Sequence, residues 1–277
     1  MIKILIDSSS DFELSELKNM EFVPITITLG EKEYRDGIDL NKDNLYEMME
    51  ETKLFPKTAQ PSPAEFADIF EKAKETGDEL ICFLLSSGLS GTYQSAVLAK
   101  SIADYDGIYL IDTLNATHGI RFMVEYAQKL ISDGLTAHMI AEKIEGLKPR
   151  IRIMAGVDTL EYLCRGGRLS RAAATVGELA NLKPIVGVSS EGKVEVFGKA
   201  LGRLKAIQFL MKQIDESNLD LEFPIYSLFS YGTDNLVKLE DKMEKNGYTI
   251  TNRLQIGATI GAHLGPGAFG FAYVVKE

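Results

Sequence analysis

The 277-residue sequence is poor in cysteine and has no excess of positive charge. These two absences exclude several classes of protein. Its two cysteines, Cys82 and Cys164, lie far apart and belong to no C-x-x-C pair or Cys/His cluster, which argues against a disulfide scaffold and against a structural zinc site. Lys and Arg number 30 against 40 Asp and Glu, a net charge of -10. Nucleic acid is therefore not expected as a partner, because backbone binding needs a concentrated positive surface.

Long apolar runs are also missing. The longest, Leu80 to Leu85, has six residues, whereas a helix that spans a bilayer needs about 20. The opening Met1 to Asp7 reaches an acidic residue after too few apolar ones for a signal peptide. We therefore expect a soluble, cytoplasmic protein with reduced thiols.

The length and the apolar content predict a large α/β protein. At roughly 150 residues per domain the chain is long enough for about two domains, and 45% apolar residues can supply both a core and a ligand cavity. Strand-like and helix-like segments alternate, as in layered α/β domains. The pattern changes after Lys148-Pro149-Arg150, so we predict one α/β domain over 1–150 and a second over 151–277.

The individual elements follow from apolar periodicity and from turn and cap residues. In the first half we predict strands at 2–6, 22–29, 80–85 and 107–111, and helices from 62, at 90–103 and at 116–147 with a break at 132–134. In the second half we predict helices up to about 182, at 201–214 and at 235–245, and strands at 151–157, 184–188, 193–197, 224–229, 248–254 and 269–275.

Three polar segments follow predicted strands, at 57–63, 86–95 and 256–270. Ligands of open α/β sheets bind beyond the carboxyl ends of strands, so these positions favour a binding site. In the second segment Gly88 and Gly91 let a ligand approach the backbone, and Ser90 adds a hydroxyl in front of a helix start, which together form an anion cradle. The alternative, that these residues only cap the helix, carries equal weight.

His263 has small neighbours on both sides, so a ligand could approach it closely and accept a hydrogen bond from it. The alternative is a histidine that bonds backbone carbonyls in a tight turn. His118 and His138 lie in helical patterns and are interpreted as packing or surface residues. The nearby Gly265 to Gly270 matches G-x-G-x-x-G, but it precedes a predicted strand instead of opening a helix, and we reject it as a nucleotide site.

Arg165 to Arg171 places three cations within seven residues of an acidic chain. They are either ordinary solvated charges or a local positive patch that meets a phosphate, an anionic lipid surface or an acidic partner. The second reading is compatible with the acidic total, because fields in salt act over only about 10 Å.

Taken together, these segments resemble the DegV family of bacterial lipid-binding proteins, whose members include the fatty-acid-binding B subunits of fatty acid kinase. The resemblance covers essentially the whole chain. It is carried, in order, by Ile6-Asp7-Ser8, Lys57 to Ser62, Ser86 to Ala96, Ile111-Asp112-Thr113, Thr159 to Leu163 with Gly166-Gly167-Arg168, Leu182 to Ile185 and Ile260 to Gly267.

The resemblance implies two α/β domains that hold one long-chain fatty acid in a tunnel, with its carboxyl group at the domain interface and no cofactor. It also implies that a separate kinase subunit phosphorylates the carboxylate with ATP, and that the acyl phosphate passes to phospholipid synthesis, with transient contact at the membrane surface. By resemblance, Thr58 and Ser90 bind the carboxyl group, with the Gly91 amide and His263 close by. Arg168 and Ser87 would lie near the head group or the partner.

Two departures from the family pattern leave roles open. Ala59 replaces a hydroxyl residue, and the stretch 199–205 lacks the usual Arg-Gly-Lys-Lys pattern.

Two other functions also remain open. One is an acyl hydrolase or transferase with Ser90 as nucleophile and His263 as base, which requires these side chains within about 3 Å and a third orienting group. The other is a regulator that binds a different small amphiphile.

Overall fold

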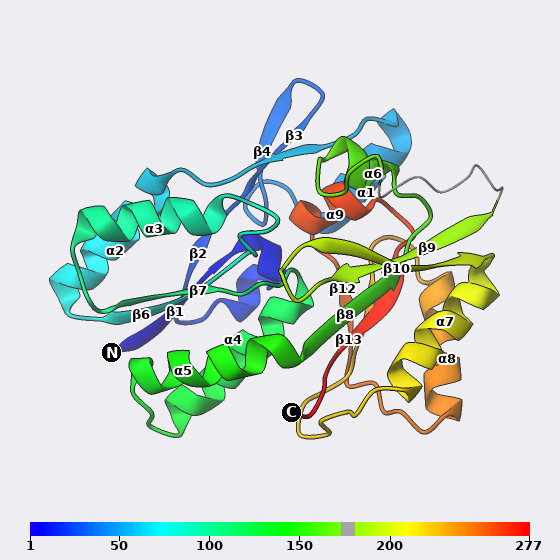
Figure 1. The fold of residues 1–277 in the computed structure, drawn as a ribbon. Coiled ribbons are helices and arrows are strands. Elements are labelled where there is room, and N and C mark those ends of the chain that lie inside the picture. Colours follow the sequence, from blue (N-terminus) through cyan, green and yellow to red (C-terminus); the bar gives the residue numbers. More distant parts are fainter. Residues whose placement is uncertain (173–180) are drawn as a thin grey trace.

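A four-stranded parallel sheet forms the first layer of the structure, a computed structural model that describes residues 1–172 and 181–277 (Figure 1). Its strand order is β2 (Met20–Val23), β1 (Ile2–Asp7), β6 (Glu79–Leu84) and β7 (Ile108–Asp112). The helices α2 (Pro63–Thr76) and α3 (Thr92–Ala103) cover one face, and α4 (His118–Ser132) and α5 (Ala137–Leu147) cover the other.

The continuous apolar sequence of β1 is explained by burial on both faces. Successive side chains of a strand point to opposite faces. Leu5 packs in the cluster with α2 and α3, whereas Ile4 and Ile6 pack in the cluster with α4 and α5. The same alternation along β6 places Cys82 with the first cluster and Phe83 with the second.

A six-stranded mixed sheet forms the second layer. Its order is β10 (Val194–Leu201), β9 (Leu182–Val188), β8 (Ile151–Gly156), β13 (Phe269–Val274), β11 (Tyr226–Phe229) and β12 (Asn252–Gln255), with parallel pairing between β11 and β12 and antiparallel pairing elsewhere. The helices α7 (Arg203–Asp215) and α8 (Asp234–Lys245) cover one face. On the other face Phe122 of α4 stacks on Tyr226, with ring centroids 4.6 Å apart, so one core joins both layers.

A small antiparallel sheet, β4 (Lys32–Arg35), β3 (Thr26–Leu29) and β5 (Lys57–Ala59), lies beside α1 (Lys42–Thr52). The helix α9 (Ala258–Leu264) comes from the far end of the sequence but contacts α1, β3, β5 and α6 (Glu161–Arg165). The Tyr46 hydroxyl of α1 donates a hydrogen bond to the Ile256 carbonyl at 3.0 Å just before α9. Segments from the first and the second half of the chain thus meet at α9. Short helical turns complete the described elements at Ser8–Ser10, Leu14–Glu16 and Lys148–Arg150.

The predicted α/β class is confirmed, but the single strand predicted at 22–29 is wrong. The segment forms two strands, β2 and β3, in different sheets. Pro24 has no N–H with which to continue a ladder, and the Ile25 N–H donates to the Ser8 hydroxyl at 3.0 Å instead of to a strand. The chain therefore changes sheet at this point.

The second half begins, as predicted, with a strand directly after Arg150, and each strand of the six-stranded sheet follows that residue. The domain boundary itself stays a prediction. The helices predicted up to about 182 are represented by α6, and the rest of that prediction falls on 173–180, outside the described residues. The segment Gly265 to Gly270 follows α9 and runs into the first residues of β13, consistent with our rejection of a nucleotide motif. None of the helices in the described residues is both long and apolar enough to cross a bilayer.

Candidate functional site

A largely apolar cavity lies where the two larger sheets and α9 meet. The empty space between its lining residues is ≈ 790 Å³, which includes open solvent at its mouth. The apolar part of the wall comes from both halves of the chain. The first half contributes Ile25, Leu85, Leu89 and Ala116, and the second half contributes 153–155 of β8, 186–188 of β9, Leu228, Ile256, Ile260 and Leu264. Such a wall suits a hydrocarbon chain better than a polar metabolite.

One part of the wall is polar, and it is built from four of the predicted site residues. Thr58 comes from β5, Ser90 from the loop after β6, Arg168 from the turn after α6, and His263 from α9. The Thr58 hydroxyl and His263 Nε2 are 2.9 Å apart although 205 residues separate them in the sequence. The fold thus concentrates the polar groups at one place in an otherwise apolar cavity.

His263 is neutral at physiological pH. Burial lowers its pKa to about 4, and the positive charge of Arg168 acts in the same direction. The ring is only 8% exposed. Nδ1 has no hydrogen-bond partner among the described residues, and Gly166 lies so close that a Cβ there would be 2.1 Å from it. The imidazole can therefore act as a neutral hydrogen-bonding group, not as a counter-ion for a carboxylate.

Arg168 lines the cavity but directs its guanidinium at backbone carbonyls. Its Nε donates to the Leu89 carbonyl at 3.0 Å, and Nη1 donates to the Gly166 carbonyl. Half-burial lowers its pKa. The bond to Leu89 ties the loop after α6 to the loop before α3, and the bond to Gly166 holds the Arg168 side chain within its own loop, so Arg168 closes one side of the cavity.

The loop between β6 and α3 caps the start of α3 and also contributes to the cavity wall, the two roles considered for it from the sequence. The Ser90 hydroxyl accepts a bond from the Thr92 amide at 3.3 Å at the start of α3, and it pairs with the Thr92 hydroxyl at 2.9 Å, while Ser90 also lines the cavity. Gly91 does not line the cavity, and a Cβ there would lie 1.9 Å from Oε1 of Gln60, so the Gln60 side chain would have to move. Ser87 is exposed and its amide donates to Asp112, so it does not belong to the cavity wall.

The remaining residues singled out in the sequence lie elsewhere. Arg165 pairs with Glu161 at 2.7 Å and covers the ring of Phe55 at 4.0 Å, so this arginine, like Arg168, has partners of its own. His138 is exposed, whereas His118 is fully buried and its Nε2 bonds the Gln255 carbonyl at 3.2 Å. The departing stretch 199–205 spans the end of β10 and the start of α7.

Sequence reasoning missed two threonines of the cavity wall, Thr117 and Thr259. The only signal for Thr259 is its spacing of four residues before His263, which places both on one face of a helix. Nothing in the sequence around Thr117 distinguishes it. Within the described ranges, no group of three or more His, Cys, Asp or Glu side chains is arranged to hold a metal ion.

Comparison with known proteins gives the family. The model of a family described as "Uncharacterised protein, DegV family" matches residues 1–276. The chain belongs to the DegV family. A DegV domain-containing protein of Caldanaerobacter subterraneus is 34% identical to it over 99% of both chains.

Solved DegV structures share the whole fold. A DegV family protein from Thermus thermophilus, described with its fatty acid binding, matches with a TM-score of 0.87 and 32% identity over 99% of both chains. The Fatty Acid Kinase (Fak) B3 protein of Streptococcus pneumoniae, loaded with linoleic acid, matches with a TM-score of 0.86 and 25% identity over 100% of both chains. DegV proteins of this fold therefore include proteins that bind fatty acids.

Proposed function

We propose that this DegV protein binds one long-chain fatty acid in the cavity and holds its carboxyl group at the polar part of the wall. The observation that carries the proposal is the cavity itself, whose wall is largely apolar but has a polar part built from Thr58, Ser90, Arg168 and His263, with Thr117 and Thr259 as further hydroxyl groups. Two DegV neighbours described with fatty acids support it. Residues 1–150 and 151–277 are the two domains that we propose on either side of the head group.

The apolar wall supplies most of the affinity. Burial of an acyl chain contributes about 0.8 kcal/mol per methylene, so a chain of roughly sixteen carbons gains on the order of 10 kcal/mol before entropy costs. The polar groups therefore need only orient the carboxyl group. Neutral donors such as the hydroxyls of Thr58 and Ser90 suit that task.

The same donors leave the carboxylate reactive. A bidentate arginine pair would stabilise the charged oxygens and lower their nucleophilicity, but the Nε and Nη1 groups of Arg168 already bond the carbonyls of Leu89 and Gly166. We therefore propose that a separate kinase subunit uses ATP to phosphorylate the bound carboxylate, as the similarity to the Fatty Acid Kinase B3 protein suggests. The Arg168 side, with the exposed Ser87, is the surface that we propose for this partner.

The geometry argues against a serine hydrolase. His263 Nε2 pairs with Thr58, and the Ser90 hydroxyl pairs with Thr92. No hydrogen bond between Ser90 and His263 occurs among the described residues, although a nucleophile and its base need one. Incubation with a labelled acyl ester and no partner tests this point, and we expect no turnover.

Native mass spectrometry of the protein purified from a bacterial host tests the binding function. We expect a co-purified adduct at the mass of one fatty acid, which disappears on delipidation and returns when palmitic acid is added. An empty protein that takes up no palmitic acid would contradict the proposal. Addition of a fatty acid kinase catalytic subunit and ATP to the loaded protein then tests presentation, with acyl phosphate as the expected product.

A further inference from the structure

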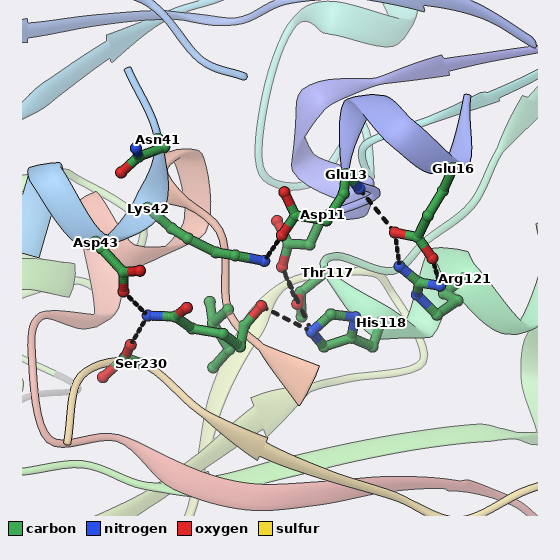
Figure 2. Close-up of polar contacts among 12 residues, drawn as sticks. Asp11, Glu13, Glu16, Asn41, Lys42, Asp43, Thr117, His118, Arg121 and Ser230 are labelled. Carbon is green, nitrogen blue, oxygen red and sulfur yellow. Dashed lines mark hydrogen bonds and ion pairs between the residues drawn. The ribbon is translucent and has the colours of Figure 1, made fainter. Parts of the chain in front are cut away.

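Two threonines of the cavity wall donate hydrogen bonds from their hydroxyl groups to buried aspartates. The Thr259 hydroxyl donates to Asp36 Oδ2 at 2.5 Å. The Thr117 hydroxyl donates to Asp11 Oδ2, as Figure 2 shows. Both carboxylates are buried, Asp36 at 5% and Asp11 at 6% exposure. Neither aspartate lines the cavity, so each acts on the wall only through its threonine or the backbone.

Asp36 also holds the first turn of α9. The Thr259 amide donates to Asp36 Oδ2 at 3.0 Å, across 223 residues of sequence. The first amides of a helix have no partner within the helix and need one outside it. Gly257, the residue before α9, has no side chain to serve as a cap. Asp36 therefore takes the place of the missing cap from a distant part of the chain.

The first turn of α9 determines where His263 lies. Thr259 and His263 are four residues apart on one face of the helix, and both reach the cavity. The Thr259 hydroxyl also lies 3.2 Å from the Ser8 hydroxyl, but Asp36 accepts from both the amide and the hydroxyl of Thr259. Since α9 has only seven residues, a displacement of its first turn carries His263 and its bond to Thr58 with it. We propose that Asp36 is a positioning residue for the carboxyl-binding end of the cavity, an inference that rests on the proposed function.

The approach to α9 is held in the same way by the cluster in Figure 2. His118 Nε2 bonds the Gln255 carbonyl at 3.2 Å, and the Gln255 side chain donates to Asp43 at 2.8 Å. Thr117 has a φ of 47°, an unfavourable value for a β-branched residue, and its bond to Asp11 maintains that conformation. The bonds of Gln255 to His118 and Asp43 thus hold the chain just before α9 begins.

The test compares a ligand with a carboxyl group and one without it. Binding of palmitic acid and of 1-hexadecanol is measured for the delipidated wild type and for Asp36→Ala. Because Asp36→Ala removes the acceptor of the first turn of α9, we expect about tenfold weaker binding of palmitic acid, a change of about 1.4 kcal/mol. We expect less than about a twofold change for 1-hexadecanol, since the apolar wall supplies its affinity.

Asp36→Asn and Asp78→Ala are the matched controls. Asn keeps an oxygen that can accept from Thr259, so we expect Asp36→Asn to restore most of the palmitic acid affinity. Asp78 bonds the amino terminus, Lys3 and Thr76 away from the cavity, and we expect Asp78→Ala to lower stability without changing the ratio of the two affinities.

Two results would overturn the positioning role: an unchanged palmitic acid affinity in Asp36→Ala, or an equal loss for both ligands. If Asp36→Ala does not fold, Thr259→Val replaces it, and an unchanged ratio of the two affinities there overturns the role as well. If the wild type binds neither ligand, the proposed function fails together with this inference. If the wild type binds palmitic acid and only the variants behave otherwise than expected, the inference fails alone.

Discussion

Gly166→Ala is the sharpest perturbation of the proposed carboxyl-binding end of the cavity. Gly166 has a φ of −73°, so alanine adds no backbone strain. Its methyl would lie 2.1 Å from His263 Nδ1 and 2.7 Å from Cε1. Unstrained contacts between such atoms are about 3.5 Å, so the ring has to move by more than about 1 Å. That movement breaks the 2.9 Å bond between His263 and Thr58.

A hydrogen bond of this kind contributes about 0.5–1.5 kcal/mol, and so we expect up to about tenfold weaker binding of palmitic acid by Gly166→Ala. Isothermal titration with palmitic acid and with 1-hexadecanol measures the effect, and the alcohol should bind nearly as it does to the wild type.

Gly167→Ala is the matched control for this prediction. Gly167 has a φ of 74° and no atom within 4 Å of the added methyl. Alanine there costs about 1–2 kcal/mol of stability through its left-handed backbone, but it leaves His263 in place. The reasoning is refuted if Gly166→Ala binds palmitic acid as the wild type does, or if Gly167→Ala loses the same affinity.

Three further predictions concern stability and ligand choice. The pKa of His263 falls from 6.5 to about 4 on folding, so the unfolded chain binds the proton more tightly. Protonation of this residue therefore lowers the free energy of unfolding by up to about 3 kcal/mol as the pH falls from 6.5 to 4. Urea titrations of His263→Gln at both pH values should lack that part of the loss. Gly146→Ala, in the interior of α5 with no atom within 4 Å of the added methyl, should raise stability by roughly 1 kcal/mol in the same assay, and a destabilised variant would contradict it. Ala155→Phe fills part of the cavity, so native mass spectrometry with a mixture of fatty acids should show a shift to shorter chains, and an unchanged preference would show that Ala155 does not limit chain length.

Local spacing was enough to predict most elements of the fold. The capping box of α2 is present as predicted, with the Ser62 amide donating to Glu65 at 2.8 Å. The apolar runs of β1 and β6 predicted strands buried on both faces, and both lie inside the parallel sheet. The prediction for 22–29 failed because apolar residues continue on both sides of Pro24, and only the pairing partners distinguish two strands from one.

The sequence by itself determined the α/β class, the absence of the usual nucleotide and zinc motifs, and the residue types of the polar cavity end, because these depend on neighbours a few positions apart. The tertiary structure alone decided which of those residues meet. Thr58 and His263 are 205 residues apart, and the anchor of α9 at Asp36 spans 223. No periodicity encodes such contacts, since they arise only when separate layers pack against one helix.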